Sequence, residues 1–293
     1  MHDRFINPRI LASISNLQLA AKTVVDGFMF GSHQSPKIGT GLEFSQYRSY
    51  EPGDDLRRVD WKMYARSDRY YVREAEIESS ITVRFILDAS ASMLHDDSGL
   101  TKFDFARLVV AALAWLAHSQ GDAIGLDAVN NQHRRRLLPH RGQKHLHRFY
   151  HQLEQAAPIG IWPVELTNEL HAANHRDIIV VVSDMHENSD EIEQALATLA
   201  ALKNEVILFH VLGRNEIDFT YKGALTFEDL ESGRSVHVDT DKIRQASVAK
   251  LQRRITSIRK KMHDQQISCE LLAMDQPLEL ALRSFLTRRM KLS

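Results

Sequence analysis

Two short segments of this chain place oxygen-bearing side chains directly after apolar runs. The first is Asp88-Ala89-Ser90-Ala91-Ser92 and the second is Ser183-Asp184. Carboxylates and hydroxyls form an all-oxygen donor set, which suits a hard divalent cation such as Mg²⁺ or Mn²⁺ that keeps several of its waters. The segments therefore predict a cation site whose ligands, direct or through water, are Asp88, Ser90, Ser92 and Asp184. In an alternative interpretation, Asp88 and Ser90 only cap the turn that follows, since both residue types are common caps.

The elements predicted around these segments alternate between strands and helices from residue 81 onwards. Such alternation is typical of a mostly parallel sheet with helices on both faces. Binding sites in such sheets lie beyond the carboxyl ends of the strands, where Asp88 and Asp184 are expected. We predict strands over 82–87, 123–129, 135–138, 178–182, 205–211 and 267–272, a hairpin around 231–234, and helices over 102–118, 143–156, 165–174, 190–203, 241–264 and 277–290.

The first 80 residues have a different pattern. Apolar residues at helical spacing predict an amphipathic helix over 8–27, with Gly27 as its stop. Residues 28–80 contain a Gly-rich passage and the turn signal Glu51-Pro52-Gly53-Asp54-Asp55, so we expect a small β-rich or irregular extension. The predicted organisation is an N-terminal helix over 1–27, the extension over 28–80, and the α/β domain over 81–293.

An apolar strand followed by Asp88-x-Ser90-x-Ser92, with Ser183-Asp184 closing a later strand, resembles the von Willebrand factor A fold and its metal-ion-dependent adhesion site. The resemblance implies a Rossmann-like α/β fold. It also implies a threonine ligand in a loop between the two strands, where this chain reads Pro158-Ile159-Gly160-Ile161-Trp162-Pro163 and has no hydroxyl. Either Thr167, a few residues later, substitutes for it, or the site is incomplete and binds metal weakly.

A dense pattern of residues in the extension indicates which family of von Willebrand-like proteins the chain resembles. It consists of Gly41-Leu42-Glu43-Phe44, Arg48, the run from Tyr50 to Arg57, Val59-Asp60-Trp61-Lys62 and Ala65-Arg66, and later Lys102, Asp122, Gly125 and the segment 229–233 also match. Over about residues 30–290 the chain resembles the domain of unknown function 58 family, bacterial proteins with a von Willebrand-like domain. The resemblance implies partnership with MoxR-type AAA+ ATPases, with this chain as an adaptor in protein remodelling or maturation. For the motif itself we favour a scaffold role, with Trp61 anchoring it to the sheet domain.

Composition excludes several other classes of protein. With 37 Lys and Arg against 38 Asp and Glu, the near-zero net charge argues against a dedicated binder of nucleic acid or membrane surfaces. The longest apolar stretch, 108–117, is roughly half the ~20 residues that a membrane-spanning helix needs. The single cysteine, Cys269, excludes an intrachain disulfide, and we expect a cytoplasmic protein. Because Cys269 lies within a predicted strand, we expect its side chain in the core.

Histidine is abundant, with 15 residues, and several lie among Arg and Lys between 133 and 151. His147 and His151 are four residues apart, as are His171 and His175, so each pair would share a helical face. Neither pair has the further ligands that Zn²⁺ needs, and we interpret the segment 133–151 as a solvated basic surface. Such a surface could contact an acidic partner.

The sequence carries no signature of catalysis. It has no GxSxG elbow, no GxxxxGK[ST] phosphate loop and no dinucleotide fingerprint after a strand. We therefore predict a non-enzymatic adaptor with no catalytic residues, whose cation is completed by an acidic residue of a protein partner. Two alternatives stay open: a metal-dependent hydrolase using Asp88 and Asp184 to activate water, and a structural module with an empty, degenerate site.

Overall fold

The computed structural model describes residues 8–12, 16–32, 46–49, 71–74, 81–163, 177–186 and 190–290. The chain divides into two compact units, one formed by residues 1–32 together with 81–293 and the other by residues 33–80. In the second unit, β1 (Gln46–Ser49) and β2 (Tyr71–Glu74) pair in antiparallel register. The rest of the 41–66 motif, including Trp61, lies outside the described residues.

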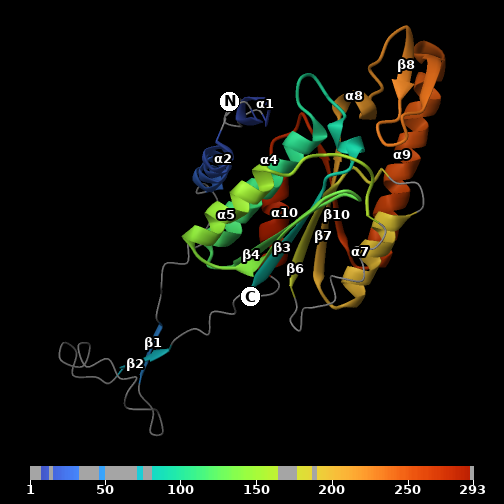
Figure 1. The fold of residues 1–293 in the computed structure, drawn as a ribbon. Coiled ribbons are helices and arrows are strands. Elements are labelled where there is room, and N and C mark those ends of the chain that lie inside the picture. Colours follow the sequence, from blue (N-terminus) through green and yellow to red (C-terminus); the bar gives the residue numbers. More distant parts are fainter. Residues whose placement is uncertain are drawn as a thin grey trace. The chain divides into compact units, whose positions relative to one another are not determined.

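A six-stranded sheet forms the centre of the first unit (Figure 1). Its order is β10-β7-β6-β3-β4-β5, and only the edge strand β5 runs antiparallel to its neighbour. From β3 the chain moves outward on one side through β4 and β5, then returns to the other side through β6, β7 and β10. The order thus reverses between β3 and β6, which is where open α/β sheets bind ligands. The strands are β3 (Thr82–Asp88), β4 (Ala123–Val129), β5 (Arg134–His140), β6 (Ile178–Ser183), β7 (Glu205–Leu212) and β10 (Ser268–Ala273).

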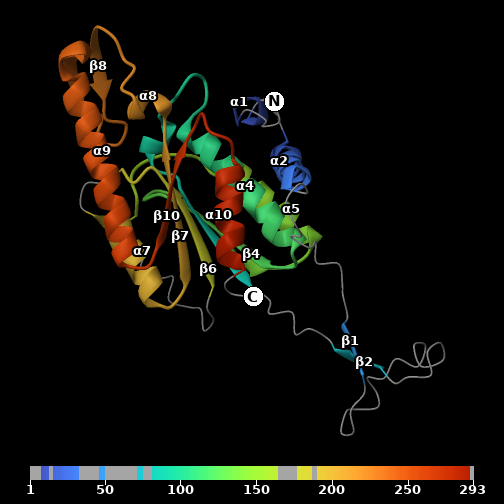
Figure 2. The same cartoon turned by 180° about the vertical axis from the view of Figure 1, so that it is seen from behind.

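Helices cover both faces of the sheet (Figures 1 and 2). On one face the core includes α4 (Lys102–Ser119), α5 (Gln143–Glu154) and α10 (Glu279–Arg289), and on the other it includes α7 (Glu191–Ala201) and α9 (Thr240–Asp264). The strands alternate between the two cores: Phe85 and Leu87 face the first, and Ile86 faces the second. The predicted α/β fold, with a mostly parallel sheet and helices on both faces, is confirmed.

Helix α4 is apolar on nearly all sides because it is covered on nearly all sides. One side packs on the sheet, and α2 (Leu17–Ser32) contributes Ala20, Ala21, Val24 and Val25 to the same core. A helix with this composition must be buried in this way to be stable in water. The stretch 108–117, which is too short to span a membrane, is thus accounted for as core. None of the helices in the described part of the chain is long and apolar enough to cross a membrane.

The N-terminal segment differs from the single helix predicted over 8–27. Two helices are present, α1 (Pro8–Ala12) and α2, and the second continues past Gly27 to Ser32. The Asn16 side chain starts α2 by accepting a hydrogen bond from the Leu19 N–H, at 2.9 Å. A side chain at Gly27 would meet open space, so no close contact requires the helix to end there.

The other described strands and helices lie close to their predicted positions. Two single turns were not predicted: the 3₁₀ turn η2 (Ala91–Leu94) and α8 (Arg214–Ile217). The helix predicted over 165–174 lies outside the described residues. The hairpin around 231–234 is present as β8 (Ala224–Glu228) and β9 (Ser235–Asp239), a separate two-stranded sheet next to α9.

His145 corrects the interpretation of the segment 133–151 as wholly solvated. His145 is buried in α5, and its Nε2–H donates a hydrogen bond of 2.8 Å to the Ile124 carbonyl of β4. Helix α5 turns Leu146, Phe149 and Leu153 towards the sheet, and His145 enters the core beside them. Burial, together with the nearby charges of His140 and Arg148, lowers the pKa of His145 below its usual value of 6.5. The other histidines of the segment, His133, His140, His147 and His151, are exposed, as predicted.

Acid should destabilise the protein partly through His145. Because its pKa is lower in the folded chain, the unfolded chain binds a proton first as the pH falls below 6.5, and the unfolding free energy decreases. In His145→Gln, whose amide can donate the same hydrogen bond, this loss is absent. Urea denaturation at about pH 7.5 and about pH 5.5 should show the smaller decrease in the variant. His147→Gln is the exposed control, and equal decreases in all three proteins would contradict the assignment.

Candidate metal site at the carboxyl end of the sheet

The parallel pairing of β3 and β6 brings the two oxygen-rich segments together. Asp88 is the last residue of β3 and Ser183 the last of β6, and both are fully buried. The Ser183 hydroxyl donates a hydrogen bond of 2.6 Å to Asp88 Oδ2. The two segments, about ninety residues apart in sequence, therefore meet in direct contact, as predicted from the strand ends.

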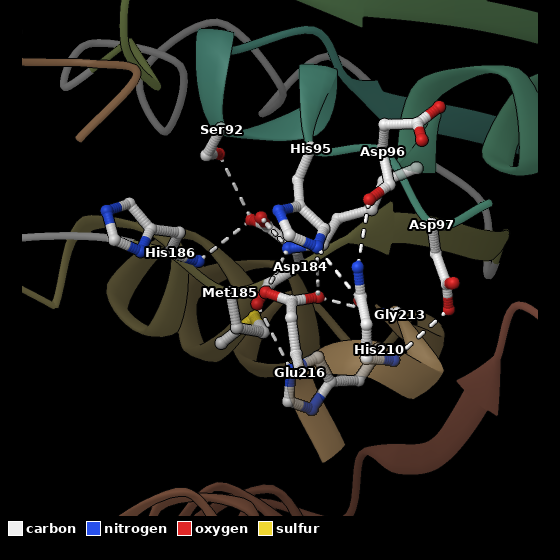
Figure 3. Close-up of polar contacts among 12 residues, drawn as sticks. Ser92, His95, Asp96, Asp97, Asp184, Met185, His186, His210, Gly213 and Glu216 are labelled. Carbon is white, nitrogen blue, oxygen red and sulfur yellow. Dashed lines mark hydrogen bonds and ion pairs between the residues drawn. The ribbon is translucent and has the colours of Figure 1, made fainter. Parts of the chain in front are cut away.

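The loop after β3 connects the other predicted ligands. Asp88 Oδ1 accepts a hydrogen bond of 2.9 Å from the Ser90 N–H, and the Ser90 and Ser92 hydroxyls lie 2.9 Å apart. The Ser92 hydroxyl donates to Asp184 Oδ1 at 3.2 Å (Figure 3). All four predicted ligands thus belong to one buried hydrogen-bond network. The capping alternative explains only part of it, since Ser90, the residue preceding η2, makes no side-chain cap hydrogen bond.

The loop of residues 158–163 packs against this network through its backbone. The Gly160 carbonyl accepts from the Ala91 N–H at 2.8 Å, and the Ile159 N–H donates to the Ala89 carbonyl at 2.9 Å. Gly160 has a φ of +67°, and a Cβ there would lie 2.0 Å from Asn131 Oδ1, so the close approach requires glycine. The loop thus contacts residues 89 and 91 through backbone hydrogen bonds. Thr167, the candidate for the missing hydroxyl, lies outside the described residues.

A buried lysine compensates the charge of Asp184. Lys102 begins α4, and its Nζ lies 2.9 Å from Asp184 Oδ2 and 2.9 Å from Glu216 Oε1 of α8. Glu216 is held in turn by the Gly213 N–H, at 2.8 Å from Oε2, in the same set of contacts drawn in Figure 3. Burial opposes the charged ammonium, but Asp184 and Glu216 together raise the pKa of Lys102 above its usual value.

The two buried carboxylates have different electrostatic surroundings. Burial and the charge of Asp184 raise the pKa of Asp88 to about 6, despite the hydrogen bonds from Ser183 and Ser90. Burial would also raise the pKa of Asp184, but the Lys102 ammonium and the His186 N–H hold it below its usual value. Asp184 is therefore a stable anion, whereas Asp88 keeps its charge only against the cost of burial.

A third carboxylate reaches the network from the β8–β9 turn. Burial raises the pKa of Glu231 to about 7, the Ser92 hydroxyl lowers it by hydrogen bonding, and the charges of Asp184 and Asp88 raise it further. Its Oε1 atom is buried and has no hydrogen-bond partner among the described residues. Asp184 raises the pKa of Asp88, and both raise the pKa of Glu231, so a cation here would offset their mutual repulsion.

These observations fit a divalent cation held by few charged ligands. Within the described ranges, no three His, Cys, Asp or Glu side chains are arranged to hold a metal ion by themselves. A cation here would depend on Asp88, Asp184 and the Ser90 and Ser92 hydroxyls, with water in the other positions, as suits Mg²⁺. The all-oxygen donor set and the unpaired Glu231 oxygen both agree with that chemistry.

Sequence reasoning identified the network's centre but assigned no role to Lys102, Glu216 or Glu231. Lys102 was recognised only as matching the family pattern, although a lysine at the start of an apolar helix, next to the Thr101 cap, is an unusual core residue. Glu216 lies on a four-residue helix that has little sequence signal. Glu231 lies in a segment that matched the family, but nothing in sequence connects that turn with Asp88.

Removing the Lys102 charge should destabilise the fold strongly. Lys102→Met leaves Asp184, whose side chain is 1% exposed, without its compensating ammonium. Breaking a buried ion pair from one side costs roughly 3–5 kcal/mol, so the unfolding free energy should fall by about that much. Lys102→Met combined with Asp184→Asn should lose less than the sum of the two single changes, as measured by urea denaturation. Strict additivity would contradict the pairing, and Lys242→Met, at an exposed ion pair, should change little.

Comparison with known proteins identifies the family of this chain. The family described as "Protein of unknown function DUF58" matches residues 46–256. Uncharacterized proteins of Mycobacterium tuberculosis and Mycobacterium bovis are each 27% identical to this chain over 232 residues, covering 78% of this chain and 73% of theirs.

Solved structures with a similar fold were also found, each at a TM-score below 0.5. BatB from Bacteroides thetaiotaomicron has a TM-score of 0.48 at 14% identity, covering 72% of this chain and 100% of its own. An aerotolerance-related membrane protein from Bacteroides fragilis has a TM-score of 0.47 at 15% identity, with the same coverage. The SpRpn10 VWA domain has a TM-score of 0.42 at 11% identity, covering 70% of this chain and 95% of its own. The match over residues 46–256 identifies this chain as a member of the DUF58 family.

Proposed function

We propose that this protein is an interaction module that binds a protein partner through a divalent cation at the carboxyl end of its sheet. The observation that carries the proposal is the convergence of Asp88 and Asp184, linked through Ser183 and Ser92, at the point where the strand order reverses. When bound, Mg²⁺ or Mn²⁺ would supply a positively charged position that an acidic side chain of the partner can complete.

Each of the four predicted ligands would contribute a different oxygen to such a cation. Asp88 is oriented by the Ser90 N–H and the Ser183 hydroxyl, so its carboxylate stays fixed while buried. Asp184 offers Oδ1, the oxygen that contacts the Ser92 hydroxyl, because Oδ2 is occupied by Lys102. The Ser90 and Ser92 hydroxyls would turn from each other towards the cation. Thr167 stays a further candidate ligand.

Apolar side chains support a protein as the partner. Loops at this end of the sheet expose Leu94 of η2, Ile159 and Ile161 of the loop 158–163, and Leu230 of the β8–β9 turn. Apolar patches rimmed by polar residues mark protein interaction surfaces, and a partner bound at this end of the sheet would cover these four side chains. The family resemblance suggests a MoxR-type AAA+ ATPase as the partner, in a pathway of protein remodelling or maturation.

The contacts of the two aspartates favour binding over hydrolysis. A metal-dependent hydrolase would need a general base near the water that Asp88 and Asp184 activate. In the described residues, the carboxylate oxygens of these aspartates bond to serine hydroxyls, Lys102 and backbone N–H groups, not to an imidazole. The nearby His210 is buried, donates to the Asp184 backbone carbonyl, and has its pKa lowered by burial to about 4.

One observation favours a second candidate, a module that works without metal. The Lys102 ammonium already lies against Asp184 and compensates one of the buried charges. In this alternative, Lys102 provides the positive charge that makes the site stable, and the partner is recognised by shape and apolar contacts.

Metal binding and partner binding should both depend on Asp88. We expect wild-type protein to bind Mn²⁺, and Asp88→Asn to weaken that binding about tenfold or more, as measured by isothermal titration. A MoxR-type AAA+ ATPase from the same organism should bind the wild type in Mg²⁺ but not in EDTA. Asp264→Asn, an exposed carboxylate at the end of α9, serves as the matched control. Undiminished ATPase binding in EDTA and in Asp88→Asn would contradict the proposal and favour the metal-free module.

A further inference from the structure

The edge strand β5 and helix α5 carry a run of basic side chains that the proposed cation site does not use. Between Asp127 and Glu154 the sequence contains no acidic residue, whereas Arg, Lys and His are frequent. Strand β5 is an outer strand of the six-stranded sheet, and α5 packs on β4 and β5. In both views of the domain, α5 lies on the side away from α9 (Figures 1 and 2).

Four of these cations are exposed and lack a counter-ion within the described part of the chain. They are Arg135 of β5, Arg141 of the turn after it, and Lys144 and Arg148 of α5. Asp122, which lies near Arg141, is already bound by Arg289 at 2.7 and 2.8 Å. We call these four residues the basic edge.

The other two arginines of β5 are paired and point to the opposite face of the sheet. Asp127 of β4 accepts a hydrogen bond of 2.9 Å from Arg134 and lies 3.8 Å from Arg136. Between them, Arg135 opposes Ala128, which belongs to the core beneath α5. Since side chains alternate along a strand, Arg135 lies on the same face as α5.

The exposed side of α5 continues this positive surface. Lys144, Arg148 and His151 are exposed and spaced four and three residues apart, so they share one side of the helix. An imidazole has an N–H donor in either protonation state, so His151 adds a hydrogen-bond donor. The pKa of the buried His145 is lowered first by burial and then by the charges of His140 and Arg148, which agrees with a positive potential here.

An acidic protein segment matches the basic edge better than a nucleic acid does. The net charge of −1 gives a nucleic acid no overall attraction to this chain. Single strands also need exposed rings for stacking, but Phe149 and Tyr150 of α5 are buried. The large apolar side chain that β5 exposes is Leu138, at 64%. Cations beside an aliphatic side chain are complementary to a peptide that combines Asp or Glu with an apolar residue.

Protection of the edge strand explains only part of this charge. Charged side chains, proline and bulges keep edge strands from pairing with other chains. Strand β5 has a register irregularity opposite Gly125, where Pro139 packs closely, so two such devices are already present. Protection does not account for Lys144 and Arg148, which lie on the helix and not on the strand.

We propose that the basic edge is a second docking surface of this protein, for an acidic segment of a protein partner. Carboxylates of the segment pair with Arg135, Lys144 and Arg148, and an apolar residue of the segment contacts Leu138. Strand β4 separates β5 from β3, which carries Asp88, so this surface is distinct from the proposed cation site. Docking at the basic edge needs no divalent cation.

The test titrates the full-length protein into a fluorescein-labelled peptide in which pairs of Glu alternate with Leu, followed by fluorescence anisotropy. EDTA is present throughout, so a cation at Asp88 cannot capture the peptide. The surface variant carries Arg135→Gln, Lys144→Gln and Arg148→Gln. The matched control removes the same charge from exposed positions of α9 by Arg253→Gln, Lys250→Gln and Arg259→Gln. Circular dichroism checks that both variants are folded.

We expect the wild type and the α9 control to bind the peptide equally, and the surface variant to bind it about tenfold more weakly, because three exposed ion pairs are lost. Added salt should weaken the binding of the wild type. Asp88→Asn should bind the peptide as the wild type does, so a failure of the proposed cation site leaves this result unchanged.

Three results would overturn the inference. The first is equal peptide binding, or none, in all three proteins. The second is self-association of the surface variant on gel filtration without peptide binding by the wild type, which would assign the charges to protection of the edge strand. The third is DNA binding that is tighter than peptide binding and is lost in the surface variant, which would assign the surface to nucleic acid.

Discussion

The fold must compensate the cost of burying two carboxylates side by side at the ends of the neighbouring strands β3 and β6. Asp88 and Asp184 are 0% and 5% exposed, and transferring such groups out of water is expensive unless each is paired or hydrogen-bonded. The surrounding residues provide hydrogen bonds and an ion pair to both carboxylates. Ser183 and the Ser90 N–H bond to Asp88, while Ser92, Lys102 and the His186 N–H bond to Asp184.

This compensation joins distant parts of the chain. Lys102 connects the start of α4 to the loop after β6 and to α8 after β7, through Asp184 and Glu216. Arg254 of α9 donates to the Met185 carbonyl, which ties the opposite face of the sheet to the same loop. A displacement of Asp184 or Met185 would therefore be felt at α4, α8 and α9 together. Such a network would couple binding at this end of the sheet, as proposed above, to helices on both faces.

The strand and helix pattern was readable from sequence because its signals were local and strong. Continuous apolar runs such as Ile178–Val182 predicted buried strands, and the polar residues at their ends predicted the centre of the site. Contacts that depend on tertiary packing were not readable. His145 enters the core only because α5 turns that face to the sheet, and Glu231 meets Ser92 only because a hairpin after β7 folds over the end of β3. The sequence thus predicted the candidate ligands Asp88 and Asp184, but not the residues that contact them from other elements, such as Lys102.

The central claim is that Asp88 and Asp184 together hold a divalent cation, and a crystal grown with Mn²⁺ tests it most directly. Anomalous diffraction would locate the ion without reference to activity or to a partner. The account predicts a single strong peak within bonding distance of an Asp88 or Asp184 carboxylate oxygen and the Ser90 and Ser92 hydroxyls. A well-ordered site with no peak, in which Ser92 still donates to Asp184 and Lys102 remains the only cation beside it, would contradict the claim.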